Sequence, residues 1–401
     1  MSKNTAAGKN YLEEQISPDG KTAPPGCLLP QDSGNLSMFS EDYPDACLDL
    51  ANSGVNGLRH GLKGGDFERA SPASNVGLPV FASRQTSGVS GRSVRDEMPY
   101  AAKAYDDLLS AMRELMDSAS STRLNTDKAE TAVTGVIQSL ERNPDALLCM
   151  PRIRRTENYT YAHCANVSVL LAAFALRSGA DKLRVRTYAL AGLLHDLGMA
   201  LLPVAVLTAR RNLSDTEKAL VRRHPLLGSE LISSLPDVRV EVRKAAMEHH
   251  ERYDGSGYPK GLAGDSISVL GMITGIADTY DAISSNRPYK GALFPHRTLG
   301  RIYQMRNKQF HPVLLEKFVR LVGIYPVGSV VELKDGYRGV VTGSNYANPL
   351  QPIVTLALDP EGHPMCLHEC DLAKDGVEGI AKCLAPENSG LDPVRILGWP
   401  Y

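Results

Sequence analysis

The sequence predicts a mainly α-helical protein with a disordered N-terminal leader and a small β-rich C-terminal appendage. Gly, Ser and Pro make up 31 of the first 97 residues, and no apolar period persists there long enough to pack. Residues 98–325 repeat apolar side chains at helical spacing. The last 76 residues instead hold short β-type runs separated by turn sequences.

The chain is accordingly divided into four parts. They are a leader at 1–97, a helical lead-in at 98–145, the main helical domain at 146–325 and the β-rich appendage at 326–401. In the lead-in we expect helices at 101–116 and at about 126–140, the second stopped by Asn143 and Pro144. These two helices either pack on the main domain or mediate dimerisation, so a homodimer or a signalling-protein partner stays open.

The main domain is a series of helices with short breaks, and no convincing β-run interrupts it. We expect helices at 161–176, 182–197, 215–232, 238–248, 269–284, 296–304 and 312–322. In the appendage the β-type runs are 327–333, 339–342, 353–358 and 365–371, which predict a sandwich-like or barrel-like unit.

The composition of the 401 residues argues against several classes of protein. A net charge of −1 does not suit a protein that binds nucleic-acid polymers. Seven scattered cysteines, an odd number, favour free thiols and a cytoplasmic location. No signal peptide is visible. The least charged stretch, 188–209, carries His195 and Asp196 near its middle, so we expect no membrane span.

Seven His and Asp residues recur along the main domain in five groups at intervals of roughly 30 residues, and each group lies on or beside an expected helix. Helical bundles build metal sites from inward-facing ligands on several helices. Imidazole and carboxylate groups suit Fe, Mn, Zn or related ions. Seven candidates exceed the needs of one tetrahedral zinc, and a carboxylate can bridge two ions. The candidates are His163, His195, Asp196, His224, His249, His250 and Asp278.

Long ordered motifs surround these residues. The sequence LLHDLG, with YTYAHC upstream and EHHERYDGSGYPKGL downstream, resembles the HD-GYP family, a branch of the HD-domain metal-dependent phosphohydrolases. The segment IADTYDAISSNRPYK matches as well, and the resemblance covers about residues 150–325. It implies an HD-type helical bundle that hydrolyses cyclic di-GMP to linear pGpG, with onward hydrolysis to GMP left open.

The resemblance also implies residue roles. The seven His and Asp candidates would hold two divalent metal ions, with Asp196 as the bridge and with His195 and Asp196 as catalytic residues. Fe or Mn are the expected ions, and Ni or Zn would also suit the ligands. Such a pair generates a hydroxide that attacks the phosphodiester.

Three further residues would bind cyclic di-GMP. Tyr258 would contact a guanine, and Arg287 and Lys290 would bind the phosphates. Each has a structural alternative: a rigid Gly-Pro turn, a helix cap and a solvated lysine, respectively. Asp281 is either a partner that orients a ligand histidine or a helix-surface charge.

Two positions depart from the family pattern. Met199 replaces a lysine, and loss of one preorganised donor costs on the order of 10²–10³ in rate. The alternative function is therefore a catalytically weak or inactive cyclic-dinucleotide receptor or interaction module. Tyr159 stands where three-metal members have a glutamate, which favours two ions. A phosphohydrolase acting on a hybrid cyclic dinucleotide is a further alternative.

Overall fold

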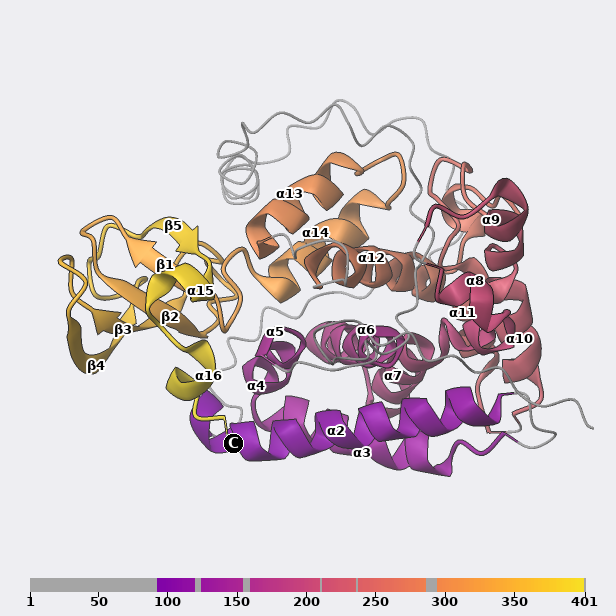
Figure 1. Ribbon diagram of the computed structural model, residues 1–401, viewed down its shortest axis with the longest axis horizontal. Coiled ribbons are helices and arrows are strands. Elements are labelled where there is room, and N and C mark those ends of the chain that lie inside the picture. The colour runs from indigo at the N-terminus through magenta and orange to yellow at the C-terminus, as the bar shows by residue number, and fades with distance from the viewer. Residues whose placement is uncertain are drawn as a thin grey trace, which may run out of the picture.

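A computed structural model describes residues 92–119, 124–153, 159–209, 211–235, 237–285 and 294–399. The molecule consists of a helical body with a five-stranded sheet beside it (Figure 1). Residues 1–91 of the expected leader lie outside the described residues.

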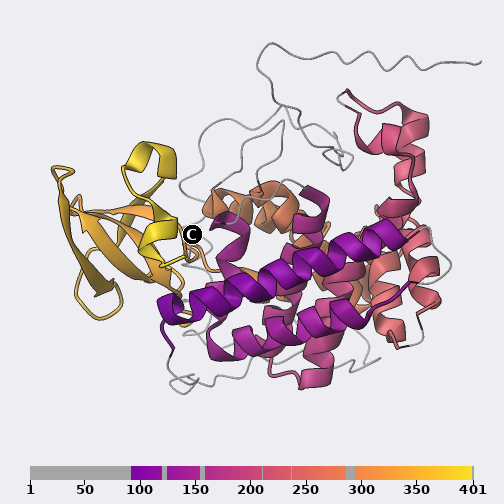
Figure 2. The ribbon, with the colours of Figure 1, turned by 60° about the horizontal axis from the view of Figure 1, so that its bottom comes forward.

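The lead-in forms two helices that lie along one side of the body, α2 (Val94–Ser118) and α3 (Asp127–Arg142) (Figure 2). The first helix begins at Val94, seven residues before the start expected at 101 and inside the leader expected at 1–97, because the Ser93 hydroxyl accepts the Asp96 N–H and caps it. Fully buried Glu97 accepts two hydrogen bonds from the Arg142 guanidinium, each of 2.8 Å, and so joins the two helices. Both helices contact α6 (Tyr159–Arg177), so they pack on the main domain.

The main domain is helical throughout, as predicted. Its elements after α6 are α7 (Lys182–Leu194), the 3-10 turn η1 (Leu197–Leu201), α8 (Val204–Leu207), α9 (Asp215–Val221), α10 (His224–Ser233), α11 (Val240–Glu248), the 3-10 turn η2 (Gly264–Ser266), α12 (Val269–Ser284), α13 (Pro295–Gln304) and α14 (Pro312–Val322). Two short helices, α4 (Pro144–Leu148) and α5 (Met150–Ile153), precede α6.

The single helix expected at 215–232 is wrong, because the chain forms α9 and α10 with a break between them. Pro225 has no N–H, so it cannot donate the helical hydrogen bond to the Val221 carbonyl four residues earlier. Its ring would also clash with that carbonyl. The Val221 carbonyl instead lies 2.8 Å from Nδ1 of His224. The helix expected at 182–197 likewise ends at Leu194, His195 and Asp196 form a turn, and Leu197 begins η1.

The central helix α6 is buried on nearly all sides. Among the described helices it alone is long and apolar enough to cross a membrane, but 83% of its most apolar window is buried inside the protein. Its apolar composition is therefore explained by its place in the core, between α2, α3, α7 and α12.

The appendage is one antiparallel sheet in the order β4-β3-β2-β1-β5. Its strands are β1 (Val330–Leu333), β2 (Arg338–Gly343), β3 (Ile353–Leu358), β4 (Pro364–Asp371) and β5 (Ile380–Leu384). The first four match the expected runs, and β5 was not predicted. Its Cys383 pairs with Val331 of β1, and Val331 also faces Gly339 of β2.

Candidate metal centre

The structure brings all seven His and Asp candidates together in one site. Their ligand atoms form two groups, within each of which these atoms lie within 4.8 Å of one another. Six of the side chains are buried, and that of His250 is 13% exposed. One group consists of Asp196, His224, His249 and His250, and the other consists of His163, His195 and Asp278.

The carboxylate of Asp196 lies between the two groups. Its Oδ1 atom is 3.2 Å from Nε2 of His224 and 3.5 Å from Nε2 of His249. Its Oδ2 atom is 3.4 Å from Nε2 of His195 and 3.9 Å from Nε2 of His163. Each oxygen therefore faces a different group, as a carboxylate that bridges two ions must.

The main chain orients three of the histidines in the same way. In His195, His224 and His249, Nδ1 lies 2.8 Å from the carbonyl oxygen of the residue three positions earlier. Because a carbonyl can only accept, each Nδ1 carries the proton and each Nε2 presents its lone pair to the site. Histidines that bind metals are typically held by such a hydrogen bond on the other ring nitrogen.

Side chains orient the fourth histidine. Nδ1 of His163 lies 2.7 Å from Oδ2 of Asp281, whose Oδ1 accepts hydrogen bonds from Asn166 at 2.8 Å and from Ser285 at 2.9 Å. The Tyr105 hydroxyl on α2 donates in turn to Oδ1 of Asn166 at 2.5 Å. Since Asp281 is only 1% exposed, it is a partner of His163 and not a helix-surface charge.

The loop after α11 places Tyr258 against His250, with ring centroids 4.7 Å apart and planes inclined by 25°. A Cβ atom on Gly257 would lie 2.3 Å from the main-chain nitrogen of Arg252, so only glycine fits there. Buried Glu251 accepts two main-chain N–H groups of the loop, at 2.7 and 3.0 Å, and fixes its path. The ring of Tyr258 therefore supports His250, and its contact with a guanine stays a prediction.

Burial and mutual proximity shift the pKa values in this cluster. Burial disfavours the charged form of Asp196, yet the surrounding histidines outweigh it and hold the pKa of this carboxyl well below its usual range. Burial, together with the neighbouring His249 and His224, holds the pKa of His250 well below its usual range. Burial also disfavours the charged form of His163, but Tyr159, Asp278 and Asp281 outweigh it and raise the pKa of this imidazole well above its usual range. Anionic carboxylate and neutral imidazole bind metal ions, so Asp196 and His250 already have the binding form, whereas an ion would displace a proton from His163.

Three buried atoms of the cluster have no hydrogen-bond partner among the described residues. They are Nε2 of His163, Nε2 of His195 and Oδ1 of Asp196. Buried polar atoms without a partner are costly, and the donor set is one of imidazole nitrogens and carboxylate oxygens. These residues therefore fit divalent metal ions.

Comparisons with known proteins agree with this geometry. A family model described as HD domain matches residues 139–314. A cyclic di-GMP phosphodiesterase of Pseudomonas aeruginosa is 38% identical over 231 residues, which are 58% of this chain and 56% of that protein. The cyclic di-GMP phosphodiesterase response regulator RpfG of Xanthomonas campestris pv. campestris is 30% identical over 247 residues, 60% of this chain and 64% of that protein. Residues 139–314 therefore match an HD domain, which agrees with the resemblance of the motifs to the HD-GYP family.

The chain thus spans between half and two thirds of these two relatives. A third relative, the 3′3′-cGAMP-specific phosphodiesterase 3 of Vibrio cholerae, is 36% identical over 171 residues, 42% of this chain and 36% of that protein. The HD-GYP relatives are therefore named for two different cyclic dinucleotides.

The residue that departs from the HD-GYP pattern, Met199, is only 1% exposed. It packs in a small apolar cluster with Leu202, Val206, Leu213 and Val221. The position that holds a lysine in the family is here part of a local core, and its side chain supplies no charge.

The two phosphate-binding candidates, Arg287 and Lys290, lie outside the described residues. The structure shows another cation beside the site. The Arg222 guanidinium lies 5.2 Å from the ring centroid of Tyr258, two residues before His224 in the chain. From the sequence alone, the pair Arg222-Arg223 is expected to be a solvated helix end that could also help to draw a charged nucleotide toward the metals. The signal that singles out Arg222 is its position two residues before His224.

Proposed function

We propose that this protein is a metal-dependent phosphodiesterase that hydrolyses cyclic di-GMP to linear pGpG. The observation that carries the proposal is the carboxylate of Asp196, whose two oxygens face two separate groups of histidines. The names of the HD-GYP relatives support the substrate, and the 38% identical relative is a cyclic di-GMP phosphodiesterase.

The proposed cofactor is a pair of divalent ions, Fe or Mn in preference to Ni or Zn. Asp196 would bridge them, and the remaining ligands would be His163, His195, His224, His249, His250 and Asp278. When bound, such a pair supplies a hydroxide at neutral pH and neutralises charge on the phosphodiester oxygens. Two ligand groups, and Tyr159 in place of an acid one turn before His163, support two ions over three.

The protein's own residues hold this site in one geometry. Main-chain carbonyls fix the tautomers of three histidines, and Asp281 fixes that of His163. Tyr258 supports His250 at the more exposed side of the site. We place Arg222 at this entrance as a cation for the substrate phosphates or a guanine, together with the predicted Arg287 and Lys290. A cytoplasmic location belongs to the same proposal, since all five cysteines in the described part of the chain are free.

The test compares the native protein with Asp196→Asn, which removes one bridging oxygen at nearly constant volume. The anaerobically purified, Mn- or Fe-loaded proteins are incubated with cyclic di-GMP and, separately, with 3′3′-cGAMP, and the products are resolved by chromatography. We expect pGpG from the native protein, two metal ions per chain by elemental analysis, and at least a thousandfold lower rate for the variant.

A matched control is Asp359→Asn, which alters an exposed Asp359-Glu361-His363 group and should leave both metal content and rate unchanged. Tight, metal-dependent binding of cyclic di-GMP without any product would contradict the enzyme and favour the receptor. Faster hydrolysis of 3′3′-cGAMP than of cyclic di-GMP would contradict the proposed substrate.

A further inference from the structure

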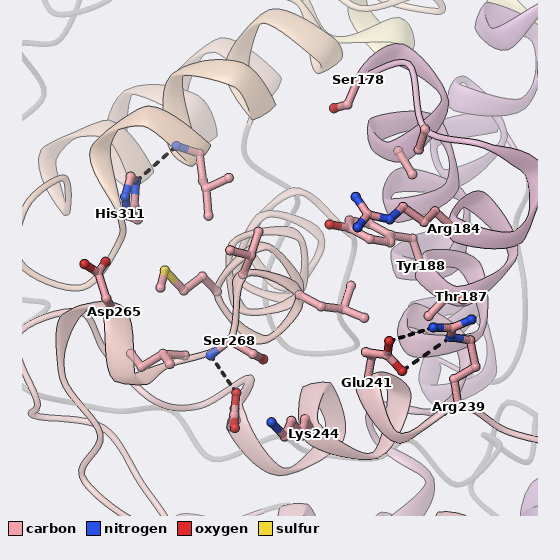
Figure 3. Close-up of a pocket in the computed structure, with 18 of the residues that line it drawn as sticks. Ser178, Arg184, Thr187, Tyr188, Arg239, Glu241, Lys244, Asp265, Ser268 and His311 are labelled. Carbon is pink, nitrogen blue, oxygen red and sulfur yellow. Dashed lines mark hydrogen bonds and ion pairs between the residues drawn. The ribbon is translucent and has the colours of Figure 1, made fainter. Parts of the chain in front are cut away.

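A cavity of about 720 Å³ lies apart from the metal centre, and none of the seven metal-ligand candidates lines it (Figure 3). Its walls come from the start of α7, from α11, from the start of α12 and from the start of α14. Arg184 lines it eleven residues before His195, which corresponds to about 16 Å along the axis of α7, whereas Glu248 at its other end directly precedes His249. A volume of this size is in the range of small-molecule sites.

The lining combines an apolar floor with aromatic walls. The floor is formed by Ile267, Val269, Leu270, Met272 and Leu314. Tyr188 lines one wall of the cavity, and Tyr253 and His311 line another. The ring centroids of Tyr253 and His311 are 5.2 Å apart, and the ring planes are inclined by 73°. Such surfaces suit a flat aromatic ring.

Two cations on the α7–α11 side, the exposed side chains of Arg184 and Lys244, form no ion pair with any described residue. Lys244 does help Arg239 to lower the pKa of the Glu241 carboxyl one turn earlier on α11. The third cation of the lining, Arg239, is engaged with Glu241 at 2.9 Å, as Figure 3 shows. The unpaired arginine and lysine favour a ligand with an anionic group, and the arginine fork suits a phosphate.

A carboxylate stands on the other side of the cavity, where Figure 3 shows Asp265 next to His311. Glu248, the other acid near this end, already accepts the main-chain N–H of Ser268 at 2.8 Å. Asp265 makes no side-chain hydrogen bond with any residue that the structure describes, so its two oxygens can accept two adjacent N–H donors. Guanine offers two such donors on one edge, N1–H and N2–H, whereas adenine offers only its 6-amino group.

We propose that this cavity binds a guanine mononucleotide. Its phosphate lies toward Arg184 and Lys244, its base lies over the apolar floor, and its N1–H and N2–H groups donate to Asp265. Three of the helices that line the cavity also carry or precede residues of the metal centre, since α7 leads to His195, α11 to His249, and α12 contains Asp278. This binding does not rest on the proposed function, whose product is linear pGpG.

The test is calorimetric titration of GMP and of AMP into the metal-loaded protein and its variants. The native protein should bind GMP at least tenfold more tightly than AMP. Arg184→Gln should weaken GMP binding about tenfold, because one charge-assisted hydrogen bond is lost. Asp265→Asn should lower the affinity for GMP to that for AMP. Lys182→Gln is the matched control, since this lysine pairs with Glu141 at 3.2 Å outside the cavity, and it should bind GMP as the native protein does.

Equal affinities of the native protein for GMP and AMP, or unchanged binding in Arg184→Gln, would overturn the proposal. Asp196→Asn separates the two sites, because it disables the metal centre and leaves the cavity intact. GMP binding that survives in Asp196→Asn and weakens in Arg184→Gln supports the cavity. Binding that disappears in Asp196→Asn and persists in Arg184→Gln places the nucleotide at the metal centre and contradicts it. Loss of cyclic di-GMP hydrolysis alone would contradict the proposed function and leave this result standing.

Discussion

At the residue scale, the most consequential contacts are those that decide which nitrogen of each histidine faces the site. Three Nδ1 atoms are tied to main-chain carbonyls within the same helical turn, so these tautomers depend on local backbone alone. His163 is different, because its Nδ1 depends on Asp281, which belongs to α12. His163 is therefore the ligand candidate whose orientation depends most on the packing of helices distant in sequence.

Met199 gives a prediction about stability. In Met199→Lys, an ammonium group would replace a thioether among Leu202, Val206 and Val221. We expect the free energy of unfolding to fall by about 2–4 kcal/mol, with no gain in hydrolysis, because a buried charge without a partner is costly. Met199→Leu conserves volume and should cost less than about 1.5 kcal/mol. Urea unfolding and the rate with cyclic di-GMP check both variants, and faster hydrolysis by a fully stable Met199→Lys protein would refute the prediction.

Arg222 gives a prediction about substrate affinity. Its guanidinium lies over Tyr258, which itself stacks on His250, whereas exposed Arg223 points to no described partner. Arg222→Ala should raise KM for cyclic di-GMP about tenfold or more and leave kcat within a factor of a few, since one charged contact is worth this much. Arg223→Ala is the control and should change neither constant. Equal effects of the two substitutions would mean that only general charge matters.

At the scale of elements, the close packing of α11 against α12 positions the ligand candidates. The start of α12 is tied to the end of α11 by the hydrogen bond from the Ser268 N–H to Glu248. Further along α12, Gly275 lies against the carbonyl of His249, so that a Cβ atom there would come within 2.5 Å of this oxygen. The same helix carries Asp278 one turn later. Close contact of α11 and α12 is thus a condition for bringing His249 and Asp278 into one site.

Gly275→Ala should therefore separate α11 from α12. We expect a loss of stability of about 1–3 kcal/mol, as for other insertions of atoms into a packed core, and a fall in metal affinity of tenfold or more. Metal titration and thermal unfolding measure the two effects. Gly135→Ala on α3 is the matched control, because its Cβ would meet Ala104 at an ordinary 3.8 Å, and it should be neutral or slightly stabilising. A Gly275→Ala protein with native metal affinity would contradict this account.

How far the sequence predicts these elements depends on how local their determinants are. The bounds of α12 and α14 were predicted to the residue, because each helix starts directly after a side chain that caps it, Ser268 or His311. The seven ligand candidates named from the sequence all lie in one site in the structure. In contrast, β5 forms by pairing with β1 some fifty residues earlier. The role of Asn166 in orienting Asp281 likewise depends on a hydrogen bond from Tyr105 of α2. Contacts between residues so far apart in the sequence leave no local pattern from which they could be predicted.

At the scale of the whole molecule, the sheet is fastened to the helical body through buried polar contacts. Asp145 of α4 accepts hydrogen bonds from the Ser344 N–H at 2.8 Å and from the Tyr346 hydroxyl at 3.0 Å. The Arg177 guanidinium, at the end of α6, lies 3.7 Å from the ring centroid of Tyr346. Arg152 donates to two main-chain carbonyls just before β1, at 3.0 and 3.2 Å. These contacts join the appendage to α4, α5 and α6, and α6 carries His163.

Asp145→Ala should loosen this attachment and leave the metal centre intact. Two donors lose their acceptor, so we expect a destabilisation of about 2–4 kcal/mol and faster amide exchange in residues 330–384. Tyr346→Phe removes only one hydrogen bond and should cost about 1 kcal/mol. Hydrogen-exchange mass spectrometry locates the change, and metal content is the control. Faster exchange spread evenly over α6 and α12 would show that sheet and body unfold as one unit.

The two ends of the described chain also meet. Gly398, with φ of 76°, passes so close to the first turn of α2 that a Cβ atom on it would lie 2.5 Å from Cγ of Arg95. Chains whose ends adjoin tolerate circular permutation. A variant that omits residues 1–91, joins residue 399 to residue 92 by a short linker and opens new ends in the turn at Asp335 and Gly336 should therefore keep the metal content of the native protein, as elemental analysis would show.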